Sequence, residues 1–116
     1  MRHQKEGRKF HRKTGQRTAF LKSLLSNLIL KGKIETTEAR AKEIKQRVEK
    51  LVTVAKKQNI ASLRILISRV SKKPAFKLYY DIAPKYADRK GGYVRIIKLG
   101  KRRVGDASTL NLVEFV

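Results

Sequence analysis

The chain has 116 residues and a formal charge of +21, from 30 Lys and Arg against 9 Asp and Glu. This excess destabilises a compact fold by self-repulsion unless a polyanion neutralises it. We therefore expect a nucleic acid partner, with an anionic membrane as the weaker alternative. The sequence has no cysteine, which excludes disulfides and Cys-based zinc sites. There is neither a signal-peptide pattern nor an apolar run of the roughly 18–20 residues that span a membrane, so a soluble intracellular protein is expected.

Residues 1–15 are predicted to form a basic arm that is disordered without a partner. Lys and Arg outnumber the single acid Glu6, and Phe10 is the only large apolar residue after Met1. Such a segment buries too little apolar surface to fold alone. Arg forks onto phosphate, and Gly7 and Gly15 let the backbone turn closely along a groove. We expect the arm to order against phosphates; a solvated tail is the alternative.

Residues 16–31 are predicted to form the first helix. Apolar residues cover more than half of its circumference, which predicts the central and most buried helix. They are Ala19, Phe20, Leu21, Leu24, Leu25, Leu28, Ile29 and Leu30. Gly32 supplies a C-terminal stop.

The segment 34–55 is predicted to be a short strand followed by a second helix. Ile34-Glu35-Thr36 alternates and is β-branched at both ends, and Thr36 or Thr37 is placed to cap the helix. One apolar stripe, on which the rest of the chain should pack, is formed by Ala41, Ile44, Val48, Leu51, Val52 and Ala55. The interleaved acids and bases of this helix indicate a solvated face.

Two shorter helices should follow. Asn59 is placed to cap a third helix of about 12 residues that carries an amphipathic pattern, and Pro74 fits the first turn of a fourth. The aromatic cluster Phe76, Tyr79, Tyr80 and Tyr86 falls at helical spacing, which favours core over a base-stacking platform.

From Gly91 the pattern changes to β-branched runs at 93–99 and 109–116, with a basic loop over 100–108 between them. We predict an antiparallel hairpin that the strand at Ile34 joins. The expected fold is one α+β domain over 16–116, in which four helices cover a small three-stranded mixed sheet.

A second basic block contains no acid from Arg89 to Arg103. Its members are Arg89, Lys90, Arg95, Lys98, Lys101, Arg102 and Arg103. Gly91 and Gly92 would let the backbone approach a phosphate, and Tyr93 offers a ring or a hydroxyl. The arm and this hairpin are therefore the predicted phosphate-binding surface.

An enzyme is not expected. His3 and His11 lie in the arm, where no scaffold fixes geometry, and Asp88 and Asp106 lie in turn-like sequence where Asp is common. No acid–base pair or nucleophile triad is visible, and no metal or cofactor is predicted. The competing interpretations are a DNA-bending nucleoid protein, a nucleic-acid-processing enzyme and a membrane-surface peptide.

Several motifs resemble the bacterial-type large-subunit ribosomal protein L17 family, in order and over essentially the whole chain. They are Met1-Arg2-His3 with Gly7-Arg8-Lys9 and Arg12, the run Ile34-Glu35-Thr36-Thr37-Glu38-Ala39-Arg40-Ala41-Lys42, the run from Asp81 to Arg89, Gly91-Gly92-Tyr93-Val94-Arg95-Ile96, and Leu112-Val113-Glu114-Phe115-Val116. Phe10 and Phe115 stand where the family commonly has Leu. Gly15-Gln16 stands where it often has a capping Ser-Ser pair, a role that Thr14 could take.

The resemblance implies a cytoplasmic structural constituent of the large ribosomal subunit. It also implies binding to 23S-class rRNA near the polypeptide exit tunnel and contact with a neighbouring protein, L32. Recognition is expected to be mostly of RNA shape. The predicted RNA-binding residues are Arg2, His3, Lys5, Arg8, Lys9, Arg12, Lys13, Arg17, Arg89, Gly91, Gly92, Tyr93, Arg95, Lys98, Lys101, Arg102 and Arg103.

Overall fold

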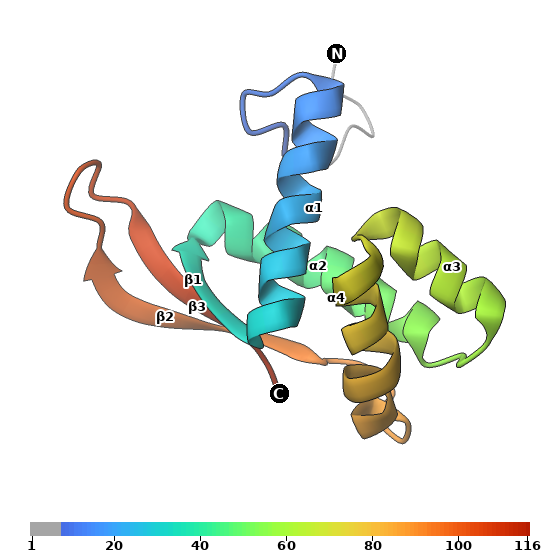
Figure 1. Ribbon diagram of the computed structural model, residues 1–116. Helices are drawn as coiled ribbons and strands as arrows, with labels where there is room; N and C mark the ends of the chain where they lie inside the picture. The colour runs from blue at the N-terminus through green and yellow to red at the C-terminus, as the bar shows by residue number, and fades with distance from the viewer. Residues whose placement is uncertain (1–7) are drawn as a thin grey trace, which may run out of the picture.

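The computed structural model describes residues 8–116, which form four helices and a three-stranded sheet (Figure 1). The elements are α1 (Thr14–Lys31), β1 (Lys33–Thr37), α2 (Glu38–Ala55), α3 (Ile60–Arg69), α4 (Lys72–Lys77), β2 (Val94–Arg102) and β3 (Thr109–Phe115). A π-helical turn, Leu78–Ile82, and a 3-10 turn, Ala83–Tyr86, continue α4. The predicted α+β class is confirmed. Within residues 8–116, no helix has the length and apolar character needed to cross a membrane.

The sheet is antiparallel throughout, so the predicted mixed sheet is wrong. Its order is β1-β3-β2, with Val113 in the middle strand opposite Ile34 on one side and Ile96 on the other. The hairpin makes β2 and β3 antiparallel, and β1 pairs with the other edge of β3, also antiparallel. The first and last strands of the sequence are therefore neighbours in the sheet.

Helix α2 is the centre of the molecule. Its apolar stripe is confirmed, since Ala41, Ile44, Val48, Val52 and Ala55 are all fully buried. The stripe faces the sheet and the other helices, and α2 contacts all three strands.

The prediction that α1 would be the most buried helix is wrong. Its first buried residue is Leu21, because the N-terminal half of α1 projects beyond the body (Figure 1). Helices α3 and α4 pack mainly on each other and on α1 and α2, so they do not cover the sheet as predicted.

Two predicted helix ends are confirmed and two caps are absent. The N–H of Gly32, at a φ of 80° that favours glycine, donates to Leu28 O at 2.8 Å. Asn59 Oδ1 accepts from Ser62 N at 2.8 Å. Thr37 occupies the cap position of α2 without a side-chain hydrogen bond. Thr14 does not cap α1, because it already lies in the helix.

The aromatic cluster is split. Tyr86 is buried against Tyr93 and Phe115, with ring centroids 5.3 and 6.5 Å away. Tyr79 packs on the core. Phe76 and Tyr80 are exposed on the surface, so the prediction of a core cluster holds only for Tyr79 and Tyr86.

Candidate nucleic-acid interface

The described part of the arm, residues 8–13, folds back on the helices instead of leaving them. The ring of Phe10 contacts Phe20 edge-on at 5.4 Å, and the Arg12 guanidinium lies 3.8 Å from the centroid of Phe20. Arg40 of α2 lies 4.8 Å from the same centroid. Such cation–π contacts hold an arginine against apolar surface, and Arg12 Nη1 also donates to Phe10 O at 2.9 Å. Predicted disorder is therefore not confirmed for residues 8–13.

A buried carboxylate ties the arm to α2. Glu43 is 5% exposed, and it accepts from Arg8 at 3.3 Å and from Arg47 at 3.2 Å. The interleaved acids and bases of this helix predicted a solvated position for Glu43, and that prediction is wrong. Removing one partner of a buried charge costs folding free energy, so the ion pair with Glu43 holds Arg8 against α2.

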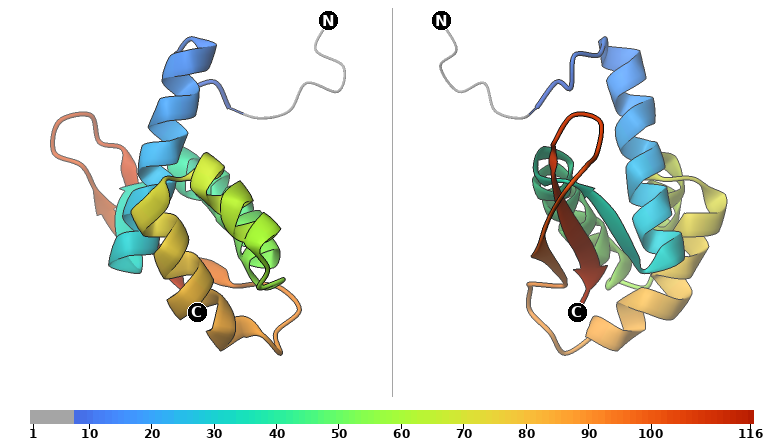
Figure 2. Two further views of the ribbon diagram at one scale, coloured as in Figure 1. Left: turned by 45° about the vertical axis from the view of Figure 1, so that its right-hand side comes forward. Right: turned by 90° about the vertical axis from the view of Figure 1, so that its left-hand side faces the viewer.

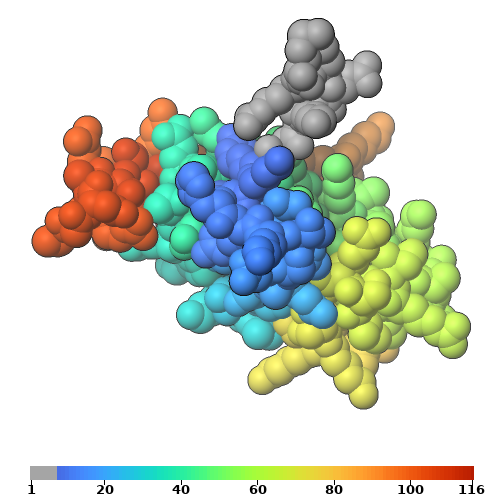
Figure 3. Space-filling model, turned by 90° about the horizontal axis from the view of Figure 1, so that it is seen from above, coloured from blue at the N-terminus to red at the C-terminus, as the bar shows by residue number. Residues whose placement is uncertain are grey.

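The arm and the hairpin flank the N-terminal end of α2. The pKa of Glu38, the first residue of α2, is lowered mainly by a hydrogen bond from Lys42 and by its charge. The charges of Lys98, from the hairpin, and of Arg8, from the arm, lower it further. In the left view of Figure 2 the arm leaves α1 on the side away from the hairpin loop, and Figure 3 shows atoms of β1 and α2 between the two. The two predicted segments thus lie on either side of the start of α2, and they are together named here the arm–hairpin surface (residues 8–13 and 98–103).

The glycine loop, residues 89–92, lies at the opposite end of α2. Lys56 Nζ donates to Tyr93 Oη at 2.9 Å and also to Arg89 O, and Tyr93 Oη donates to Arg89 O at 3.0 Å. Glu49 accepts from Tyr93 N at 3.0 Å. Tyr93 itself is only 2% exposed, so its ring positions the loop and offers no face to a base.

The second basic block, residues 89–103, was predicted to form one surface but lies in two separate places. Residues 89–93 lie at one end of α2, and residues 98–103 lie at the other, because β2 runs the length of the helix between them. Eighteen helical residues span about 27 Å. One phosphate cannot contact both places.

Three hairpin cations already have carboxylate partners. Arg95 pairs with Glu114 at 2.5 Å, Lys101 with Glu35 at 3.3 Å and Arg103 with Asp106 at 2.5 Å. Each acid comes from a distant or following stretch, which is why the basic block looked acid-free in sequence. Lys98 and Arg102 form no ion pair within residues 8–116. They are the hairpin cations most available to phosphate.

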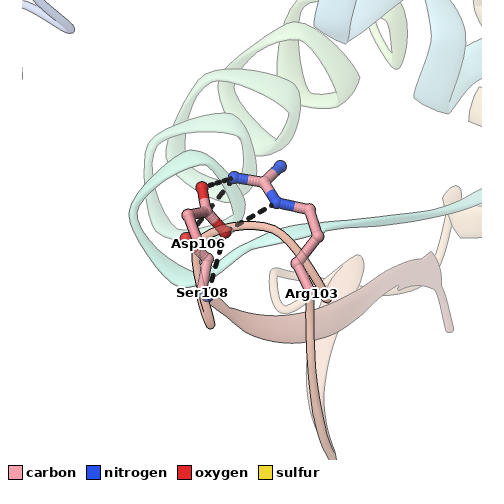
Figure 4. Close-up of polar contacts among 3 residues, drawn as sticks. All are labelled: Arg103, Asp106 and Ser108. Carbon is pink, nitrogen blue, oxygen red and sulfur yellow. Dashed lines mark hydrogen bonds and ion pairs between the residues drawn. The ribbon is translucent and has the colours of Figure 1, made fainter.

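The hairpin loop is locked by Asp106 (Figure 4). Its carboxylate accepts from Arg103 Nε at 3.1 Å and Nη2 at 2.5 Å, and from Ser108 N at 3.1 Å. The bonds from Arg103 and then from Ser108 hold the pKa of the Asp106 carboxyl well below its usual range. These hydrogen bonds favour one conformation of the loop beside Arg102 and Arg103. Lys101 and Arg102 lie in β2 and not at the tip as predicted.

Comparison with known proteins identifies the family. A sequence model of the family described as Ribosomal protein L17 matches residues 20–116. The chain is 49% identical over its whole length to the large ribosomal subunit protein bL17 of Sulfurihydrogenibium sp., of which it covers 97%. It is 46% identical to that of Dictyoglomus turgidum, each chain being fully covered, and 43% identical to that of Pelobacter propionicus, of which 91% is covered. The chain belongs to the ribosomal protein L17 family.

The L17 family is structural and non-enzymatic, as the sequence analysis expected of this chain. Within residues 8–116, no group of three or more His, Asp or Glu side chains is arranged to hold a metal ion. The match of the family model begins at Phe20, so it includes the hairpin and the glycine loop but not the arm. The relatives nevertheless align with the whole of this chain.

The residues predicted to bind RNA lie in several separate parts of the structure. Arg2, His3 and Lys5 lie outside the described residues. Arg8, Lys9, Arg12 and Lys13 lie in the folded-back arm, and Arg17 is in the first turn of α1, donating to Arg12 O at 3.4 Å. Sequence reasoning missed Arg40 and Arg47, which contact the arm's partners Phe20 and Glu43. The only signal in the sequence for these two arginines was their position on one face of the predicted second helix.

The Asp106 lock predicts a pH-dependent loop. A carboxylate with a lowered pKa stabilises the fold at pH values above the unfolded Asp pKa of about 3.9, and the effect disappears as pH falls through the folded-state pKa. The Ser108 amide should therefore keep its hydrogen-bonded NMR shift well below pH 4. In Arg103→Gln the transition should move up toward the ordinary Asp range. An unchanged midpoint in Arg103→Gln would show that Arg103 does not hold the carboxylate.

Proposed function

We propose that this chain is a structural constituent of the large ribosomal subunit that binds 23S-class rRNA through the arm–hairpin surface. Family membership supports the assembly, since the relatives are named as large ribosomal subunit proteins. A place near the polypeptide exit tunnel, a neighbouring contact with L32 and a cytoplasmic location are parts of the same proposal. These three parts rest on the family resemblance alone.

The observation that carries RNA binding is that basic residues of the arm and of the hairpin flank the N-terminal end of α2. Lys9, Lys13, Lys98 and Arg102 are exposed there and form no ion pair within residues 8–116. Lys and Arg that neutralise phosphates release counterions, and each contact adds about 0.7–0.9 to the salt dependence of binding. A surface built this way recognises backbone position and shape more than base edges.

Sedimentation of cell lysate on sucrose gradients at low and moderate salt tests the assembly. The chain should migrate with large subunits and stay with them at moderate salt. A Lys98→Gln/Arg102→Gln variant should leave them at lower salt than the unmodified chain, while Lys57→Gln/Lys85→Gln, which removes two exposed cations outside the surface, should not. Migration at the top of the gradient, or with DNA after RNase treatment, would contradict the proposal and favour the nucleoid alternative.

A further inference from the structure

A groove between α1, α2 and α3 has no counterpart in the sequence predictions. It has a volume of about 460 Å³, within the size range of small-ligand sites. Its floor is formed by leucine side chains of α1 and α2 that are almost wholly buried: Leu21, Leu25 and Leu51, which are 4, 6 and 8% exposed. The cations that line it come from all three helices: Arg17, Lys22, Arg47, Lys50 and Arg69.

The charge of this groove is strongly one-sided. Glu43 is its one acidic lining residue, and that carboxylate is already paired with Arg8 and Arg47. Lys22, Lys50 and Arg69 form no ion pair within the described part of the chain. The complementary occupant is therefore a polyanion. A strand of nucleic acid brings a row of phosphates, and positively charged grooves of this kind track its backbone.

The groove continues toward the glycine loop. Lys50 also lines a second hollow, of about 270 Å³, whose other walls include Lys90, Gly91 and Gly92. The one acid in its lining, Glu49, already accepts a hydrogen bond from Tyr93 N. Both hollows thus open along one side of α2, on residues three or four positions apart that share a helical face. Together they connect the anchored arm, through Glu43, to the backbone of the glycine loop.

We propose that an unpaired strand of RNA runs along this side of α2, from the arm to the glycine loop. Its phosphates lie on the cations of the groove. The inference rests on the proposed rRNA binding and adds a third contact to it. It also explains how two predicted sites at opposite ends of α2 serve one nucleic acid.

The test compares two triple variants of equal charge change. Lys22→Gln/Lys50→Gln/Arg69→Gln removes groove cations that pair with no described carboxylate. Lys57→Gln/Arg64→Gln/Lys85→Gln removes three exposed cations outside the groove. Binding to a transcript of a bacterial large-subunit rRNA is measured by filter retention from 50 to 300 mM salt. The groove triple should bind at least tenfold more weakly, with a log–log salt slope smaller by about 2, at roughly 0.7 per single-strand phosphate.

Equal binding by the two triples, with the unmodified chain still bound, would overturn the groove and leave the proposed function standing. Failure of the unmodified chain to bind would instead count against the proposed function. If the groove triple does not fold, Gln46→Trp fills the groove without changing charge and should also weaken binding at least tenfold.

Photo-crosslinking from position 68 in purified large subunits identifies the occupant. A crosslink to rRNA supports the proposal. A crosslink to an acidic protein segment alone would overturn it.

Discussion

Replacing Ile44 with Asp is expected to leave the chain unfolded. Ile44 has no exposed surface and lies in the stripe of α2 that contacts the sheet and the other helices. The substitution removes a core side chain, at a cost of about 2–5 kcal/mol, and places an unpaired charge where water cannot reach it. Because small domains are stable by only about 5–15 kcal/mol, the two effects together exceed what this domain tolerates. Circular dichroism should show lost helix signal and no cooperative melting.

Ile65→Asp is the matched control for this substitution. Ile65 is also helical, in α3, but it is 44% exposed to solvent. That variant should melt within a few degrees of the unmodified chain. If Ile44→Asp melted in the same way, the stripe of α2 would not be the core.

Deleting residues 1–13 is expected to leave a folded domain that has lost most of its rRNA affinity. The deletion removes six Lys and Arg residues, so the salt slope of binding should fall by about 4–5. The fold keeps its core, which begins at Leu21. It does lose the Arg8–Glu43 pair and the Phe10 contact on Phe20, so the free energy of unfolding should drop by about 1–3 kcal/mol. Thermal melting and filter binding measure the two effects separately.

A charge-only variant separates the contribution of arm charge from that of arm packing. Replacing Arg2, Lys5, Lys9 and Lys13 with Gln keeps Phe10 and the contacts of Arg8 and Arg12. It should melt like the unmodified chain and still bind rRNA more weakly. Unfolding on deletion of 1–13 would show that the arm is part of the core, contrary to its composition.

The elements were predictable because local patterns specify them. The stripe from Ala41 to Ala55, the Asn59 cap and the Gly32 stop all depend on neighbours within a few residues. The position of each element was less predictable. A wide apolar face made α1 look central, yet part of that face, Phe20, serves to hold Phe10 and Arg12.

The candidate site was also only partly predictable from the sequence. Sequence charge identified the arm and the basic block, but not that Glu35 and Glu114 pair with two of its cations across the sheet. Those partners are far away in the chain, and only the strand register brings them together. The burial of Glu43 was hidden for the same reason, since its partner Arg8 lies 35 residues earlier.

The pairing of β1 with β3 has a consequence for how this chain folds as it is made. Residues 33–37 find their hydrogen-bonding partners only at 110–114, so the sheet cannot close until nearly the whole chain has been synthesised. The helices depend on local contacts and form early, whereas contacts of such high sequence separation form late and slowly. Until then the buried face of α2 has no sheet to cover it. We therefore expect a nascent chain to lack this sheet, and the cover it gives to α2, until residues 110–114 have been added.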